Sequence, residues 1–271
     1  MISNKGNNSN NPAVNYKADV TIDNPIPNSQ FLIPFILNLA DNTLIMSQRL
    51  GEWTGYGPAL EQDIAMTNIS LDYLGQARNF YQYIAELKQD GSTEDSIAYL
   101  RDANKYQNHL LVELPNGDWA QTILKIFFFA AYQKPLYQRL MQGNDMQIAA
   151  IAEKSIKEVN YHLKWSSDWV IRLGDGTEES HQRMLKAIDI LWPYTGELFE
   201  SIPNNNLPVD YNLINDFWMN SISEIFKKAT LKVPAVKPFQ TGGLKGVHTE
   251  HLGYILAEMQ YLQRVYPNSQ W

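Results

Sequence analysis

Four side chains have the types that bind iron in helical proteins: Asp41, Asp72, Glu158 and His162. Glu158 and His162 lie four residues apart in the long helical pattern of residues 153–176, so both project from one side of that helix. Carboxylates and imidazoles are the usual ligands of non-haem iron. Two hypotheses follow. The four residues bind metal, or they mark a former metal site whose side chains now satisfy one another.

The spacing of these residues departs from the di-iron motif. A di-iron bundle takes one Glu from each of two helices and Glu-x-x-His from each of the other two. The corresponding runs are D-Y-L-G at residues 72–75 and E-V-N-Y at residues 158–161, so Gly75 and Tyr161 stand at the histidine positions. The apolar centre of the helix between them, residues 123–132, has no carboxylate. We therefore predict no catalytic, cofactor-binding or metal-binding residue, and hydrogen bonds around the four vestigial side chains.

Two further histidine patterns have simpler explanations. Glu178 and His181 form a literal Glu-x-x-His, but they follow Thr177 in a first helical turn, where acids and a threonine cap are favourable. His248 and His251 lie three residues apart, and zinc would need at least one more ligand. We expect structural roles for both patterns, with metal binding as the alternative. The Gly-rich segment 242–246 could contact a phosphate, although a flexible entry loop is the simpler interpretation.

Long amphipathic helices account for most of the chain and must position these residues. Apolar periodicity predicts these helices at residues 31–51, 58–87, 119–141, 153–176, 177–191, 212–228 and 248–265. The connection 88–117 has the pattern of one short helix at 94–101. Pro135 should bend the helix at 119–141. Short to moderate connections indicate an antiparallel bundle, and the fold class is all-α.

The first 30 residues differ in composition from the rest. They are rich in Asn, Ser and Pro and have little apolar periodicity. Such a segment buries too little apolar surface to offset its ordering entropy. We predict a disordered tail at 1–30 and one helical domain at 31–271.

Composition limits the functional classes. The formal net charge of −7 gives no general attraction for phosphates, which argues against nucleic-acid binding. The absence of cysteine excludes disulfides, thiolate nucleophiles and sulfur-ligated metals. No stretch approaches the roughly 20 apolar residues that span a bilayer. We expect a cytoplasmic protein that is not in a membrane.

Several strings of residues together resemble one family. They are SQRLGEW at 47–53, LGQARNF at 74–80, LVE at 111–113 with PNG at 115–117, residues 158–169, TGG at 241–243, GVHTEHLG at 246–253 and LAEMQYLQR at 256–264. These strings are similar to the C-subunit family of ring 1,2-phenylacetyl-CoA epoxidase, over residues 31–271. The resemblance implies a ferritin-like helical bundle with additional C-terminal helices that has lost its metal site. It also implies a partner, a related A subunit that holds the di-iron centre and receives electrons from NADPH through a flavin and iron–sulfur reductase.

Three functional hypotheses remain open at this point. The leading one is a non-catalytic structural subunit of a multicomponent phenylacetyl-CoA monooxygenase, bound to the A subunit and to further subunits. The second is a metal-dependent oxidase that uses Asp41, Asp72, Glu158 and His162. The third is a homo-oligomeric binding module. Iron content separates the first two, and purification without a partner would favour the third.

Overall fold

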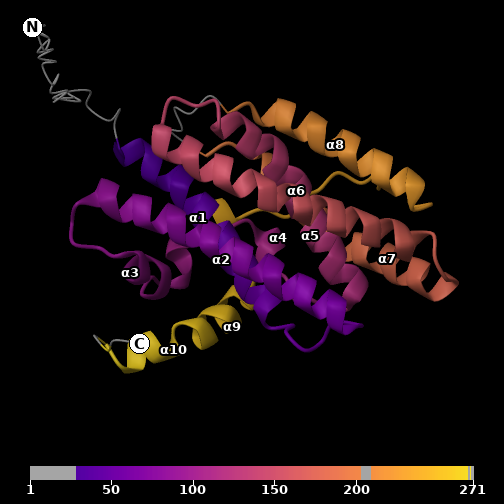
Figure 1. Cartoon of the computed structure of the whole chain (residues 1–271), viewed down its shortest axis with the longest axis horizontal. Coiled ribbons are helices and arrows are strands. Elements are labelled where there is room, and N and C mark those ends of the chain that lie inside the picture. Colours follow the sequence, from indigo (N-terminus) through magenta and orange to yellow (C-terminus); the bar gives the residue numbers. More distant parts are fainter. Residues whose placement is uncertain (1–28, 203–208, 268, 270–271) are drawn as a thin grey trace, which may run out of the picture.

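The computed structural model describes residues 29–202, 209–267 and 269, and this part of the chain contains ten α-helices and no β-strand (Figure 1). The helices are α1 (Ser29–Gly51), α2 (Leu60–Lys88), α3 (Glu94–Tyr99), α4 (Leu110–Glu113), α5 (Trp119–Leu140), α6 (Met146–Gly174), α7 (Glu178–Leu191), α8 (Tyr211–Lys228), α9 (Glu250–Met259) and α10 (Tyr261–Val265). The all-α, ferritin-like prediction is confirmed. The predicted tail, 1–30, lies almost entirely outside the described residues.

Four long helices form the bundle. α1 packs along α2 and α5 packs along α6, and contacts between α2 and α6 join the two pairs. Each pair is joined by a short connection, so its helices run antiparallel. α7 and α8 cover α5 and α6, while α9 and α10 extend from the other end of the molecule (Figure 1).

α5 is the central helix of the core. Every residue from Ala120 to Gln133 is buried, which explains why its sequence is apolar on all sides rather than on one stripe. Phe127 and Phe128 pack on Phe226 and Trp218, and the Trp218 indole N–H donates to the Phe128 carbonyl at 2.9 Å. Burying each such aromatic ring contributes about 1.5–3 kcal/mol. α5 therefore holds the other long helices in register.

Side-chain caps fix where the helices begin. Asp118 accepts a hydrogen bond from Gln121 N at the start of α5, and Asp145 accepts one from Ile148 N at the start of α6. α2 begins at Leu60, not at Pro58 as predicted, because the Asp63 carboxylate accepts from the backbone amides of the preceding glycine turn. α6 begins at Met146, well before the predicted start at residue 153, because Asp145 caps it there.

The C-terminal region differs most from the prediction. The single helix expected at 248–265 is wrong: the chain forms α9 and α10, with Gln260 between them. The Gln260 amide donates to the Arg101 carbonyl at 2.8 Å and to the Tyr106 hydroxyl at 2.9 Å.

One short helix was not predicted: α4 lies in the stretch 88–117, which was expected to be a connection. None of the described helices is long and apolar enough to cross a membrane.

Candidate functional site

Three of the four predicted side chains meet between α2 and α6. His162 Nε2 lies 2.9 Å from Asp72 Oδ2, and the Gln76 amide donates to Glu158 Oε2 at 2.9 Å. Each acid therefore pairs with a group on the opposite helix, as the sequence led us to expect for a hydrogen-bonded site. We call Asp72, Gln76, Glu158 and His162 the α2–α6 cluster.

The α2–α6 cluster lies at the edge of the core. The His162 side chain is fully buried, whereas the Asp72 side chain is 33% exposed and Glu158 is half-buried. Burial raises the pKa of Glu158 above its usual value, and the hydrogen bond from Gln76 acts in the opposite direction. The arrangement joins the two helices by hydrogen bonds, and its carboxylates remain partly open to water.

The rotation of α2 and α6 about their axes corrects one inference from the sequence. Gly75 and Tyr161 are both exposed, so they are not the positions where interior histidines would stand. The buried pairs at the same spacing are Tyr73/Gln76 and Val159/His162, and the Tyr73 and His162 rings lie 4.7 Å apart between centroids. These pairs supply one imidazole and no carboxylate. They do not fit a di-iron centre, which takes its bridging ligands from glutamates.

Asp41 belongs to a different part of the molecule. Its buried carboxylate accepts hydrogen bonds from the Arg101 guanidinium, from the Tyr81 hydroxyl at 2.5 Å and from Gln107 N at 2.8 Å. These contacts fasten the 101–107 connection to α1. Within the described residues, no group of three or more His, Asp or Glu side chains is placed to share a metal ion.

The remaining histidine patterns are structural. Thr177 caps α7 by accepting from Ser180 N, and His181 Nδ1 contacts the Gly174 carbonyl at 2.6 Å. The capping interpretation of this segment is therefore confirmed. In the second pattern, both ring nitrogens of His248 are engaged by protein atoms, Nδ1 with Glu113 Oε2 at 2.8 Å and Nε2 with the Tyr106 carbonyl at 3.0 Å. No nitrogen of His248 is left to bind a metal.

Glu113 organises a second heavily bonded buried site. Its carboxylate has no exposed surface and accepts from His248, from the Asn108 amide at 2.8 Å, and from Thr249 N and Oγ1 at 2.6 and 2.8 Å. These contacts tie the start of α9 to α4. We call Glu113, Asn108, His248 and Thr249 the C-terminal anchor.

The protonation of His248 follows from its partners. A carboxylate oxygen and a backbone carbonyl both accept, so both ring nitrogens must donate and the ring is an imidazolium. Burial alone would lower the pKa of His248, but the hydrogen bond and charge of Glu113 raise it above 6.5. The C-terminal anchor is therefore built around a buried ion pair.

A second buried carboxylate binds the Gly-rich segment. Glu197 accepts from Leu110 N and Gly242 N, both at 2.7 Å, and from Leu244 N at 3.4 Å. Burial raises the pKa of Glu197, and the backbone hydrogen bonds lower it. The amides that could have bound a phosphate therefore bind a carboxylate of the same chain.

Lys125 places an amino group inside the core. Its side chain is fully buried on α5, and Nζ donates to the Leu114 carbonyl at 2.7 Å and to Asn116 Oδ1 at 3.1 Å. Burial lowers the pKa of Lys125 to about 7, and the nearby charge of Arg49 adds to this effect. Lys125 fixes the turn that follows α4.

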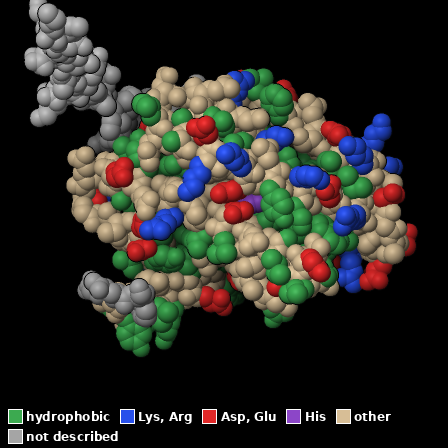
Figure 2. Space-filling model, viewed as in Figure 1, with side chains coloured by type: hydrophobic (Ala, Val, Ile, Leu, Met, Phe, Trp, Pro, Cys, Tyr) green, Lys and Arg blue, Asp and Glu red, His purple; other side chains and the backbone are tan. Residues whose placement is uncertain are grey.

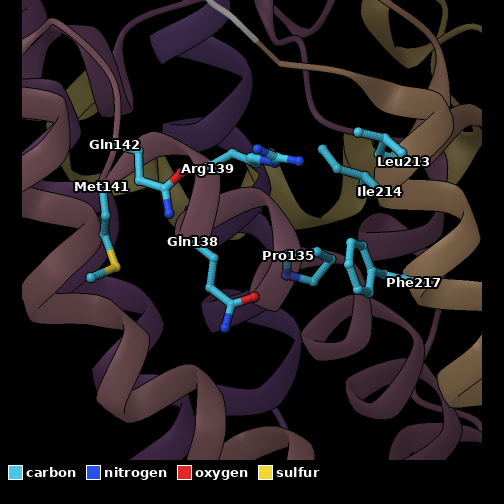
Figure 3. Close-up of a pocket in the computed structure, with 8 residues that line it drawn as sticks. All are labelled: Pro135, Gln138, Arg139, Met141, Gln142, Leu213, Ile214 and Phe217. Carbon is cyan, nitrogen blue, oxygen red and sulfur yellow. The ribbon is translucent and has the colours of Figure 1, made fainter.

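A shallow groove runs between the end of α5 and α8 (Figure 3). Pro135, Gln138 and Arg139 face Leu213, Ile214 and Phe217 across it, as the close-up shows. Arg139 is the sole titratable side chain among the described residues that line the groove. This lining has no acid–base pair and does not resemble an active site.

Comparison with known proteins places these features in a family. Residues 19–271 match the model of the family described as phenylacetic acid catabolic protein. The chain belongs to this family. It is similar to the C subunit of 1,2-phenylacetyl-CoA epoxidase from Escherichia coli (strain K12), with 48% identity over 246 residues, which cover 89% of this chain and 99% of that protein. The predicted resemblance is therefore confirmed.

In this member of the phenylacetic acid catabolic family, sequence reasoning missed Glu113, Glu197 and Lys125 as polar sites. One signal was available for Lys125, a cation within the apolar run of residues 123–132. The glutamates gave no such signal, because their partners lie on segments far away in the sequence. The sequence singled out Asp72, Glu158 and His162 because they lie on two regular helices, but it gave no role to Gln76.

Proposed function

We propose that this chain is the C subunit of a 1,2-phenylacetyl-CoA epoxidase in phenylacetate catabolism, and that it is a non-catalytic structural subunit. The observation that carries the proposal is the 48% identity to the protein of that name in Escherichia coli, over 99% of its length. Because the match spans both proteins almost completely, it extends beyond a single shared motif.

The side-chain partners support a structural role. Asp41 is bonded to Arg101, Asp72 to His162 and Glu158 to Gln76. The Asp41 carboxylate is fully buried, so a metal ion there would have to displace a protein group. The buried residues at the ligand spacing, Tyr73 and Val159, cannot replace the missing carboxylates.

In this proposal the A subunit holds the di-iron centre and this chain holds no cofactor. The chain would bury an apolar face of the catalytic bundle and keep the iron-bearing helices in register, in the cytoplasm and with further subunits. Obligate interfaces of this kind commonly bury more than about 2,000 Å². Residues 31–271 would act as one domain in the complex.

Co-expression with the A subunit tests the proposal. We expect the two proteins to elute together on size exclusion and iron to be found only in the A subunit, by elemental analysis after the two are separated. Separate elution would contradict the role in the complex. Stoichiometric iron in the isolated C subunit would contradict the non-catalytic role.

The competing proposal is the oxidase that binds its own metal, now through Asp72, Glu158 and His162 alone, because Asp41 lies in a different part of the molecule. The contact between Asp72 and His162 across two helices favours it, since it brings a carboxylate and an imidazole together. It requires iron or manganese that is lost in His162→Ala and kept in His181→Ala, a matched change at a capping histidine. Metal content that is equal and negligible in both variants would eliminate it.

A further inference from the structure

The groove between the end of α5 and α8 exposes apolar side chains around a hollow. Phe217 is 58% exposed, Leu213 40% and Met141 38%. The hollow that these residues line has a volume of about 390 Å³. Figure 2 shows hydrophobic side chains on the surface near the beginning of α8, at the top of the view. Exposed apolar side chains gathered in this way mark interaction sites. We call this hollow the α5–α8 groove.

Arg139 gives the α5–α8 groove a positive charge that no described residue neutralises. Its side chain points across the groove towards Ile214 (Figure 3). Of the other six arginines, all within the described residues, five pair with carboxylates and one lies over a tryptophan ring: Arg49, Arg78, Arg101, Arg183 and Arg264, and Arg172. Lys134 and Asp216 are close in sequence but do not line the groove. A guanidinium binds carboxylates most strongly, so the groove suits an acid flanked by apolar side chains.

The chain has a segment of this chemistry directly before α1. Residues 20–27 read V-T-I-D-N-P-I-P, so Val20, Ile22 and Ile26 surround one carboxylate, Asp23. The two prolines restrict the backbone around them to extended conformations. A segment that is already restricted loses less conformational freedom when it docks. Residues 1–18 differ, because they are rich in asparagine and contain no acid.

The segment is long enough to reach the groove. Because the helices of each pair run antiparallel and Tyr83 Oη donates to Asp145 Oδ2 at 2.7 Å, α1 begins at the end of the bundle where α5 ends and α6 begins (Figure 1). α8 packs on α5, and packed helices lie about 8–10 Å apart, so two helix spacings, roughly 20 Å, separate α1 from α8. In extended conformation, residues 23–29 span up to about 20 Å.

The covalent link favours this occupant over a separate molecule. A segment tethered by a short linker that spans the distance has an effective concentration near the millimolar range. Even a weak contact is then sufficient to fill the groove. The one acid of the segment and the one cation of the groove also fix which residues meet.

We propose that residues 20–27 dock in the α5–α8 groove of the same chain, with the Asp23 carboxylate paired to Arg139 and apolar side chains of the segment packed on Phe217 and Leu213. This inference narrows the tail predicted to be disordered to residues 1–19. It does not depend on the proposed function. In a complex, the docked segment would keep this face of the chain from contacting other subunits.

A cysteine-free chain allows a clean cross-linking test. Asn24→Cys is combined with Gln138→Cys, which lies in the groove, in the full-length protein. The matched control combines Asn24→Cys with Gln82→Cys, which is exposed on α2 at the same end of the bundle. The rate of disulfide formation is measured for both pairs by non-reducing electrophoresis and peptide mass, with thermal unfolding as a check on folding. The pair in the groove is then measured again with Arg139→Glu, and with Arg139→Glu and Asp23→Arg together.

We expect the pair in the groove to cross-link within one chain about tenfold faster than the control pair. Arg139→Glu should remove most of this difference, and adding Asp23→Arg should restore it, since opposite charges then face each other again. Equal rates for the two pairs would overturn the inference. Disulfide-linked dimers would overturn it in favour of the segment of a second copy. A fast cross-link that Arg139→Glu does not slow would overturn the pairing of Asp23 with Arg139.

Discussion

The α2–α6 cluster and the C-terminal anchor each pair an acid with a histidine, but they differ in exposure and in the number of bonds. Asp72 is 33% exposed and bonds one imidazole, whereas Glu113 has no exposed surface and accepts four hydrogen bonds. The cluster joins two regular helices at the edge of the core. The anchor lies where distant parts of the chain meet. Of these two pairs, the more deeply buried one ties together distant parts of the chain.

The largest expected effect comes from Glu113→Gln. The amide leaves the His248 imidazolium without a counter-charge and places an N–H₂ group among donors. Removing one partner of a buried ion pair costs about 3–5 kcal/mol. Chemical denaturation at neutral pH should show this loss in the free energy of unfolding.

Glu179→Gln is the control for that prediction. Glu179 also pairs with a cation, Arg183 at 2.7 Å, but both side chains are more than half exposed. Exposed pairs contribute little, so no measurable change is expected. Equal effects of the two changes would show that the C-terminal anchor is no stronger than a surface ion pair.

Lys125→Met should change how stability depends on pH. The pKa of Lys125 falls from 10.5 to about 7 on folding, so the unfolded chain binds more protons between these values. Wild-type stability should therefore gain from this group as pH rises from 7 to about 10, by up to several kcal/mol. The difference in unfolding free energy between wild type and variant, measured across that range, should follow this rise. A constant difference would contradict the lowered pKa.

Asp72→Asn tests the α2–α6 cluster, which is the more exposed of the two sites. The asparagine keeps the shape and can still bond His162, and the site is partly open to water. We expect a loss of about 0.5–1 kcal/mol in the free energy of unfolding. A loss near that of Glu113→Gln would mean that the α2–α6 cluster also behaves as a buried ion pair, and the difference between the two sites would disappear.

Glu158→Gln should have the smallest effect, and in the opposite direction. Burial raises the folded-state pKa of Glu158 above 4.5, so its favourable contribution is present at low pH and is lost as pH rises through that pKa. The neutral amide avoids the cost of the buried charge. We expect a gain below about 1 kcal/mol at pH 7, because the site is half exposed, and no gain near pH 4. Destabilisation at pH 7 would show that the bond from Gln76 dominates.

The long helices were predictable from the sequence because their apolar periodicity is local. Which residues of α2 face the interior was not predictable, since the spacing of residues 72–75 does not reveal how the helix is rotated about its axis. Gly75 points outward because Tyr73 and Gln76 are the residues that face α5 and α6. Glu113 was harder still. Its main partner, His248, lies 135 residues away, and no short pattern encodes that contact.

That separation also matters during synthesis. At about 5–20 residues per second, the ribosome needs on the order of 10 s to add the 135 residues between Glu113 and His248. During that interval α1, α2 and α5 can assemble, while the carboxylate of Glu113 has no imidazolium to meet. The nascent bundle should therefore keep the α4 region loosely packed until the last helices emerge. Polypeptides stalled before residue 248 would be expected to be more sensitive to proteases around Glu113 than completed ones.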